Sequence, residues 1–217
     1  MIRRPVLSTL PARDVALVAG GLLALVLFAG TAAAVASGRA VPFDLACANV
    51  ALHGAPPAAA AVLRAASALG EFPAVVAVVA AVALWRFWRA DPRGALQLVA
   101  VALAEEGLNV LLKQLFHRVR PALAGLETFS FPSGHAMAAS ATYGMVAILA
   151  ARAYPALRWP LALAAAVCAL LIGASRVFLG VHWASDVLGG FAAGALVLIV
   201  AARATRPAFP GLSAGPC

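Results

Sequence analysis

The longest apolar run in the chain limits its fold more than any other feature. From Val15 to Ser37 the sequence carries no charged side chain, and these 23 residues exceed the roughly 20 that a helix needs to cross a bilayer. Five more apolar runs follow, at about residues 73–88, 94–115, 134–151, 160–178 and 184–202. A segment in lipid must satisfy its backbone hydrogen bonds internally, and a helix does so. The sequence therefore predicts an all-α, polytopic membrane helix bundle with six transmembrane helices.

The first apolar run has an alternative interpretation. Arg3 and Arg4 precede it, and Ala34-Val35-Ala36 stands directly before Ser37, so the segment resembles a cleavable signal peptide. Its apolar core is longer than the roughly 7–15 residues typical of such peptides, which favours a retained first span. In both interpretations the chain emerges on the outer side of the membrane.

The composition excludes a soluble protein. Of the 217 residues, 64% are hydrophobic and only 11% are charged, which is typical of multi-span membrane proteins. The formal net charge of +8 could suggest nucleic acid, but no basic tract with interleaved aromatic residues accompanies it. The positive residues instead flank the apolar runs. We therefore expect contact with membrane lipids and no nucleic-acid partner.

The segment between the first two spans, residues 38–72, is too polar to cross the membrane. It contains two short helical patterns, 43–53 and 57–69, on either side of a Gly-Ala-Pro-Pro break. We expect both helices to lie at the interface, in the first outer loop. His53 has no partner motif around it and is interpreted as a surface residue.

The distribution of Lys and Arg predicts the orientation, because cytoplasmic segments carry an excess of them. With the amino terminus inside, the outer segments hold six of the sixteen: Arg39, Arg64, Lys113, Arg118, Arg120 and Arg176. We therefore expect a multi-pass protein of the cell (inner) membrane with both termini cytoplasmic. Residues 15–206 would form a single membrane domain, with cytoplasmic tails at 1–14 and 207–217.

Three polar stretches lie at the outer ends of the predicted spans. They are Lys113-x6-Arg120-Pro121, Pro132-Ser133-Gly134-His135 and Ser175-Arg176-x5-His182-x3-Asp186. The middle stretch precedes a helix, whose first N–H groups can bind an anion, with Ser133 as the expected cap and Gly134 leaving room for a ligand. His182 and Asp186 are four residues apart, so Asp186 can accept from Nδ1–H of His182 and leave Nε2 free. The stretches predict a phosphate site on the extracytoplasmic face, in which cations do the work of a metal.

The ordered set of motifs resembles the type 2 phosphatidic acid phosphatase (PAP2) superfamily, with all eleven fixed positions present between residues 113 and 186. The resemblance implies a bacterial integral-membrane lipid phosphatase without a metal or cofactor. It implies that His182 is the nucleophile and forms a phosphohistidine, that Asp186 orients it, and that His135 is the general acid. The remaining residues would bind the phosphate: Lys113, Arg120, Ser133, Gly134 and Arg176.

The implied substrate is a lipid phosphate or diphosphate whose tail stays in the bilayer, such as phosphatidic acid, phosphatidylglycerophosphate or undecaprenyl diphosphate. The sequence chooses neither among these lipids nor an oligomeric state. Transfer of the phosphoryl group to a second lipid or sugar stays open as an alternative, because the same intermediate could be intercepted. A haloperoxidase is disfavoured because those relatives are soluble. A non-catalytic lipid-binding or transport protein is disfavoured by the intact motifs, and no ATP-binding loop is present.

Four charged residues near the motifs have no assigned role. Glu105 and Glu106 lie inside the third predicted span, where ionisable groups are costly and usually mark function or a buried partner. The resembling family more often has small or apolar residues there, and we favour a structural role over a catalytic one. His117 and Arg118 are adjacent to fixed positions but outside them, and both stay unassigned.

Two further patterns concern packing and cross-linking. Gly190 and Gly194 form a small-xxx-small step in the last span, which favours close helix packing inside the bundle over dimerisation. Cys47, Cys168 and Cys217 are odd in number and far apart, so no disulfide is predicted.

Overall fold

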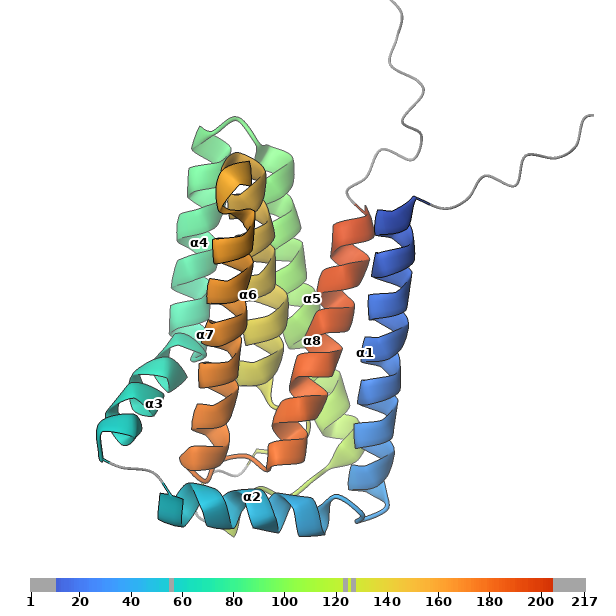
Figure 1. Cartoon of the computed structure of the whole chain (residues 1–217), viewed down its shortest axis with the longest axis vertical. Helices are drawn as coiled ribbons and strands as arrows, with labels where there is room; N and C mark the ends of the chain where they lie inside the picture. Colours follow the sequence, from blue (N-terminus) through green and yellow to red (C-terminus); the bar gives the residue numbers. More distant parts are fainter. Residues whose placement is uncertain (1–10, 55–56, 123–124, 126–127, 205–217) are drawn as a thin grey trace, which may run out of the picture.

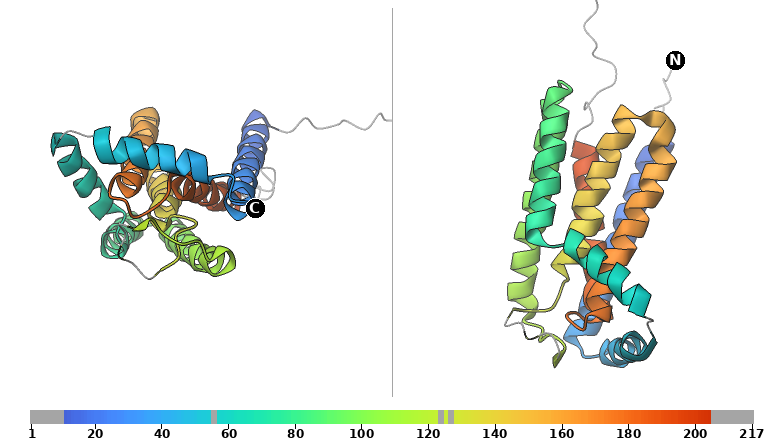
Figure 2. Two further views of the ribbon diagram at one scale, coloured as in Figure 1. Left: turned by 90° about the horizontal axis from the view of Figure 1, so that it is seen from below. Right: turned by 90° about the vertical axis from the view of Figure 1, so that its left-hand side faces the viewer.

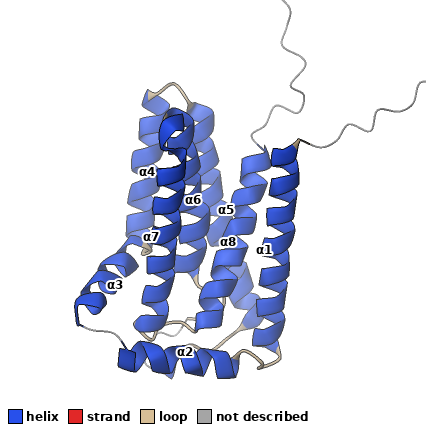
Figure 3. Ribbon diagram, viewed as in Figure 1, coloured by secondary structure: helices blue, strands red, loops and turns tan. Residues whose placement is uncertain are grey.

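The computed structural model describes residues 11–54, 57–122, 125 and 128–204 of the chain. Helices are the only regular secondary structure in these ranges (Figure 3). The all-α prediction is therefore confirmed. The predicted tail at 207–217, most of the tail at 1–14 and the side chain of His53 lie outside the described part of the structure.

The helices follow the predicted runs to within a few residues. In chain order they are α1 (Ala12–Ala36), α2 (Val41–Gly54), α3 (Pro57–Leu69), α4 (Phe72–Trp88), α5 (Pro92–Phe116), α6 (Gly134–Ala153), α7 (Arg158–Phe178) and α8 (Ala184–Ala204), with a short 3-10 turn, η2 (Pro155–Leu157), before α7. The two short helices expected in the first outer loop are thus present as α2 and α3.

Local chemistry sets the ends of α5. Asp91 precedes the helix and accepts a hydrogen bond of 2.9 Å from the N–H of Gly94, while Pro92 occupies the first turn, where no N–H is needed. Asp91 also forms an ion pair with Arg86 of α4. The hydrogen bond from Arg86, followed by that from Gly94, lowers the pKa of Asp91. At its other end α5 stops at His117, whose left-handed backbone (φ 46°) ends the helix.

Five of the described helical segments are long and apolar enough to cross a membrane by themselves: α1, α5, α6, α7 with η2, and α8. The remaining span, predicted at about residues 73–88, differs from the expectation. Helix α4 meets the length requirement only together with α3, and the two are bent by 60° where they meet. The bend lies at Gly70 and Glu71, just before Pro73, whose ring cannot continue the hydrogen bonding of a preceding helix. The chain is a multi-pass membrane helix bundle in which five described segments can each cross alone and the bent α3–α4 pair is the sixth candidate span.

Helix α6 occupies the middle of the bundle, where α5, α7 and α8 pack against it, and α1 packs on the outside of α8. The contact between α6 and α8 is close because glycines face the partner. A Cβ at Gly190 would lie 2.6 Å from the carbonyl oxygen of Ser133, and one at Gly194 would lie 2.5 Å from that of Met137. The prediction that these glycines permit packing inside the bundle is confirmed.

The bundle has two distinct ends. The start of α1, the end of α8, the α4–α5 turn and η2 lie together at one end (Figure 1). Helix α2 lies across the opposite end, beneath the bundle, as the view from below shows (Figure 2). The starts of α6 and α8, which carry two of the three motifs, lie at this α2 end.

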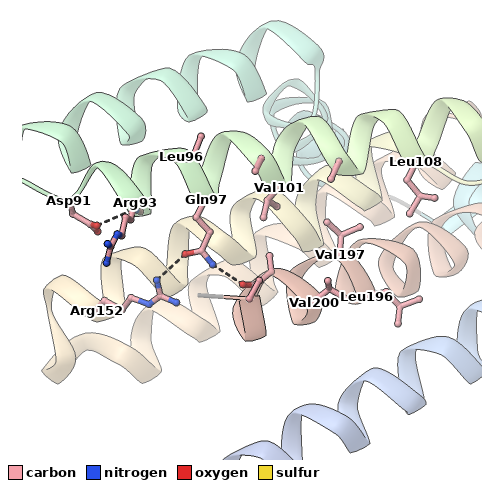
Figure 4. Close-up of a pocket in the computed structure, with 15 residues that line it drawn as sticks. Asp91, Arg93, Leu96, Gln97, Val101, Leu108, Arg152, Leu196, Val197 and Val200 are labelled. Atoms are coloured by element: carbon pink, nitrogen blue, oxygen red, sulfur yellow. Dashed lines mark hydrogen bonds between the residues drawn. The ribbon is translucent and has the colours of Figure 1, made fainter. Parts of the chain in front are cut away.

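A groove of about 1170 Å³ runs between α5 and α8. Figure 4 shows polar side chains at one end of it and apolar side chains farther along: Asp91, Arg93, Gln97 and Arg152, then Leu108 and Leu196. Its polar end lies where α5 begins and α8 ends, away from the α2 end. None of the predicted phosphate-site residues lines the groove, so it is not the phosphate site.

Candidate active site

His182 and Asp186 lie together at the start of α8, and both are buried, with 3% and 0% of their surface exposed. Nδ1 of His182 is 3.4 Å from Oδ2 of Asp186. The same oxygen accepts hydrogen bonds from the N–H of Trp183, at 2.8 Å, and from the hydroxyl of Ser130. The predicted spacing thus produces the predicted contact, and Asp186 lies behind the Nδ1 side of the imidazole.

Arg120 contacts the other side of the same ring. Its Nη1 lies 3.0 Å from Nε2 of His182 and donates to the carbonyl of Val181 at 2.7 Å, while its Nε donates to the carbonyl of Thr128 at 2.9 Å. A guanidinium can only donate, so in this contact Nε2 is the acceptor and carries a lone pair. Burial lowers the pKa of His182 to about 4, against the hydrogen bond to Asp186, which raises it. His182 is therefore neutral at pH 7.

Ser133 occupies the N-cap position of α6, but the structure corrects its expected role there. Its hydroxyl makes no capping hydrogen bond and is buried without a partner among the described residues. Its backbone N–H donates to the carbonyl of Asp186 at 3.0 Å and so is not available to a ligand. The cause is the close approach of α8 at Gly190. The open N–H groups of the helix end therefore begin at Gly134.

The motif turn before α6 is held by Asn109 of α5. Its Nδ2 donates to the carbonyl of Pro132 at 3.2 Å. A Cβ at Gly134 would lie 3.0 Å from Oδ1 of the same side chain. Asn109 therefore packs directly under the turn, and the absence of a Cβ at Gly134 leaves room for it.

His135 and Arg176 lie on the side of the site that α3 covers. Nη1 of Arg176 donates to the hydroxyl of Ser67, whereas its Nε, like Nε2 of His135, is buried without a partner among the described residues. A Cβ at Gly70 would lie 2.6 Å from Cδ2 of His135. The α3–α4 bend thus packs directly on the His135 ring.

Lys113 completes the set from the last turn of α5, where it is half-buried and close enough to Arg120, Arg176 and Asp186 to interact with their charges. The structure therefore brings all eight predicted residues to one end of the bundle: Lys113, Arg120, Ser133, Gly134, His135, Arg176, His182 and Asp186. The arrangement combines a neutral imidazole, a second imidazole, three cations and a helix N-terminus, and these are groups that can bind and transfer a phosphoryl group.

Comparison with known proteins identifies the family. The model of the PAP2 superfamily matches residues 94–209, more than half of the chain and a range that contains all three motifs. The chain belongs to the PAP2 superfamily. The prediction from the motifs is therefore confirmed.

Curated PAP2 relatives match part of the chain. It is 40% identical over 120 residues to phosphatidylglycerophosphatase B of Bacillus subtilis, covering 52% of this chain and 59% of the relative. It is 36% identical over 110 residues to lipid A 1-phosphatase of Rhizobium johnstonii, covering 43% of this chain and 42% of that protein. The matched segments thus span about half the length of these curated relatives.

A solved PAP2 structure matches much more of the chain. The crystal structure of a transmembrane PAP2 type phosphatidylglycerolphosphate phosphatase from Bacillus subtilis superposes with a TM-score of 0.79 at 30% identity, covering 84% of this chain and 94% of that one. The PAP2 fold therefore extends beyond the segment that contains the motifs, into the amino-terminal half of the chain.

Several residues outside the PAP2 motifs take part in the site, and sequence reasoning missed them. Ser130 and Ser67 contact Asp186 and Arg176. Arg118 donates to Oδ1 of Asp186 at 2.6 Å. Contacts of this kind join separate elements, so no local spacing indicates them. One signal in the sequence could have indicated such a contact. Asp44, which accepts a hydrogen bond from Arg118, is the single acidic residue between positions 38 and 70.

The other unassigned residues near the motifs are His117, Glu105 and Glu106, and they differ in burial. His117 is exposed, ends α5 and packs its ring edge-on against Phe129 at 4.5 Å, so it is not part of the site. Of the acidic pair, Glu105 is buried with Oε2 unpartnered among the described residues, whereas Glu106 is exposed. Glu105 lies one turn before Asn109 on the inner face of α5 and contacts no predicted site residue through a hydrogen bond.

Proposed function

We propose that this chain is a membrane-embedded, metal-independent phosphatase that hydrolyses lipid phosphates or diphosphates through a phosphohistidine on His182. One observation carries the proposal. The buried imidazole of His182 has Asp186 behind Nδ1 and the lone pair of Nε2 directed at the Arg120 guanidinium, 3.0 Å away. A nucleophile already oriented toward a phosphate-binding cation is what in-line attack on phosphorus requires.

The phosphate would be bound by the three cations and the open end of α6. Lys113, Arg120 and Arg176 supply positive charge for the equatorial oxygens, and the N–H groups from Gly134 onward supply hydrogen bonds. The buried hydroxyl of Ser133 and the buried Nε of Arg176 have no partner among the described residues. Both can donate to phosphate oxygens, which would satisfy them.

In the first step, the phosphate oxygens take over the Arg120 N–H and release the lone pair of Nε2. Nε2 attacks phosphorus as the bond to the leaving oxygen breaks. The negative charge of the bound phosphate favours the protonated form of His135, which then gives its proton to the leaving oxygen. The lipid alcohol, or a lipid phosphate in the case of a diphosphate, departs. The Nδ1–H of His182 stays hydrogen-bonded to the Asp186 carboxylate, which stabilises the charge that develops on the ring.

In the second step, neutral His135 takes a proton from a water molecule that attacks the phosphohistidine. The P–N bond breaks and its electron pair returns to Nε2. Inorganic phosphate leaves, and both imidazoles regain their initial states. An acceptor hydroxyl in place of water would give transfer instead of hydrolysis, so the experiment below includes a test for it.

The proposed substrate is an anionic lipid that reaches the site from the outer leaflet. The names of the curated and solved relatives support phosphatidylglycerophosphate or a related lipid phosphate, and phosphatidic acid and undecaprenyl diphosphate have the same chemistry. We place the membrane domain at residues 15–206 in the cell (inner) membrane, with both termini cytoplasmic and the site extracytoplasmic. The start of α1 and the end of α8 lie together at the end of the bundle opposite the site, which supports this topology.

The decisive experiment measures phosphate release by the detergent-purified protein in EDTA. Phosphatidic acid, phosphatidylglycerophosphate and undecaprenyl diphosphate are compared side by side, with His182→Ala as the test variant and Arg39→Gln, an exposed arginine outside the site, as the matched control. We expect release by the wild type and Arg39→Gln, and none by His182→Ala. Trapping of an acid-labile phosphoprotein in the wild type and in Arg39→Gln, but not in His182→Ala, would identify the intermediate.

Three results would overturn the proposal. Release that EDTA abolishes would show that the reaction needs a metal. Phosphorylated acceptor without free phosphate would show that the protein is a transferase. No turnover of any lipid by a folded protein would remove the enzymatic assignment.

A further inference from the structure

The ionic contacts of Asp186 continue beyond the motifs to helix α2. Nη1 of Arg118 donates to Oδ1 of Asp186 at 2.6 Å, and Nη2 of the same guanidinium donates to Oδ2 of Asp44 at 2.6 Å. Both carboxylates are almost fully buried, with 0% and 1% of their surface exposed. Arg118 also lies over the Trp183 ring, 5.8 Å from its centre. One guanidinium therefore bridges the carboxylate behind His182 and a carboxylate of the first outer loop.

Asp44 also binds the start of α8 directly. Its Oδ1 accepts the backbone N–H of Ser185 at 2.8 Å, and its Oδ2 accepts the hydroxyl of Ser185 at 2.7 Å. Ser185 lies in the first turn of α8, where backbone N–H groups lack partners within the helix and a negative charge is favourable. A side chain of α2 thus caps the helix that carries Asp186.

The three charged groups depend on one another. Buried charges are tolerated only when they are paired and hydrogen-bonded. If one partner is removed, the other stays buried as an uncompensated charge, which is strongly destabilising. Arg118 has the planar fork needed to serve two carboxylates at once, and a lysine ammonium lacks it. Asp186 uses Oδ1 for this bridge and Oδ2 for His182, so the bridge lies on the side of Asp186 away from the imidazole.

We propose that Asp44 and Arg118 are positioning residues, which hold the Asp186 carboxylate against His182 and balance its charge. Neither residue touches the reacting groups; both act through Asp186. Helix α2 is then a working part of the catalytic unit, in addition to a cover on the end of the bundle. This inference rests on the proposed phosphatase function.

The proposal predicts opposite pH effects for the two residues. His182 is surrounded by Asp186 of α8, Arg120 of the preceding loop, Arg176 of α7, His135 of α6 and Lys113 of α5. Arg118 and Asp44 lie behind Asp186. Without the Arg118 charge, the Asp186 charge is unshared and favours protonated His182, so the pKa of His182 rises. Without the Asp44 charge, Arg118 pairs with Asp186 alone and offsets more of its negative charge. Protonated His182 is then less favoured, so its pKa falls.

The test measures kcat, KM and the pH profile of phosphate release from phosphatidic acid for full-length Arg118→Gln, Arg118→Lys and Asp44→Asn, with Arg39→Gln as the control. We expect kcat to fall roughly tenfold or more in all three site variants, since small misplacements near the chemistry have effects of that size. The value of KM should change much less. The acid limb should move to higher pH in Arg118→Gln and to lower pH in Asp44→Asn. Guanidinium ions should partly restore Arg118→Ala.

Ser185→Ala keeps all three charges and is therefore expected to disturb folding less than the charge variants. It removes a hydroxyl that contacts both Arg118 and Asp44. We expect it to lower kcat several-fold without moving the acid limb. The double variant Arg118→Gln/Asp44→Asn should lose less activity than the two single losses multiplied, because both act on one carboxylate.

Unchanged kcat and pH profile in folded Arg118→Gln and Asp44→Asn would overturn the inference, as would unchanged kcat in Ser185→Ala. A loss of thermal stability with the acid limb moving the same way in both charge variants would show a merely structural role. These failures differ from failure of the proposed function, in which the wild type itself would release no phosphate.

Discussion

Nη1 of Arg120 lies 3.0 Å from Nε2 of His182 and forms a direct contact between a proposed phosphate-binding cation and the proposed nucleophile. The guanidinium holds the Nε2 lone pair toward the place where phosphorus would be. It also occupies that lone pair until a phosphate oxygen takes over the N–H. Arg120 is therefore expected to act on the substrate and on the nucleophile at the same time.

Replacement of Arg120 should show this double role. We expect Arg120→Gln to lower kcat by about 10²–10³-fold, the range seen when one preorganised donor to a transition-state charge is lost. Arg120→Lys should recover only a small part, because an ammonium cannot contact His182, Val181 and Thr128 together. The measurement is kcat with phosphatidic acid. Full activity in Arg120→Lys would contradict the geometry described here.

The pH profile should report His182. Burial lowers its pKa to about 4, below the ordinary value of about 6.5. Only neutral His182 has a free Nε2 lone pair, so activity on the acid side should be lost as the pH falls through about 4. The alkaline side of the profile should report loss of the proton from His135, the proposed general acid. The test is kcat/KM between pH 3.5 and 8, with intrinsic fluorescence to confirm that the protein stays folded. An acid limb near 6.5 would mean that His182 is not desolvated or is not the nucleophile.

Neutralising Asp186 should lower kcat far more than removing the hydroxyl of its partner Ser130. Asp186→Asn removes the acceptor for Nδ1–H and leaves Arg118 without its carboxylate. We expect kcat to fall on the order of 10³–10⁴-fold, as when other His–Asp pairs are broken. Ser130→Ala removes one hydroxyl from the same carboxylate and should cost much less. Equal losses in the two variants would argue against a special role for the carboxylate charge.

The glycines that let α8 approach α6 should be intolerant of a methyl group. A Cβ at Gly190 would lie 2.6 Å from the carbonyl oxygen of Ser133, a backbone atom that cannot move aside cheaply. We expect Gly190→Ala to destabilise the protein by about 1–3 kcal/mol and to lower activity by displacing the turn before α6.

Gly30→Ala in α1 is the matched control for this prediction. No atom lies within 4 Å of a Cβ at that position, and alanine is the better helix former by about 1 kcal/mol. Thermal unfolding of the two variants in the same detergent measures the difference. A Gly190→Ala protein as stable and active as Gly30→Ala would contradict the packing of α6 on α8.

Glu105 should prove structural, not catalytic. It is buried at membrane depth, and its Oε2 has no partner among the described residues. We expect Glu105→Gln to keep phosphatase activity within about twofold and to leave stability unchanged or raised, since the amide has nearly the same shape and never carries a charge that burial would penalise. Glu106→Gln, on the exposed face, is the control. A large loss of activity in Glu105→Gln alone would assign Glu105 a role in the reaction.

The sequence by itself determined most of the helices and the eight motif residues that meet at one end of the bundle. Apolar runs report how each segment partitions between lipid and water, which is a property of the segment alone. The three motifs could be assigned to one end because alternate spans return the chain to the same side of a membrane. His182 and Asp186 were paired correctly because residues four apart meet on one turn, whatever surrounds them.

Only the tertiary structure decided what surrounds these residues. The bend between α3 and α4, the loss of the Ser133 N–H to Asp186 and the bridge from Arg118 to Asp44 all depend on how separate helices pack. Asp44 and Ser185 are 141 positions apart in the sequence yet share two hydrogen bonds. Periodicity and spacing describe neighbours along one helix. The partners of a buried charge are set by which helices meet, and packing of the whole bundle determines that.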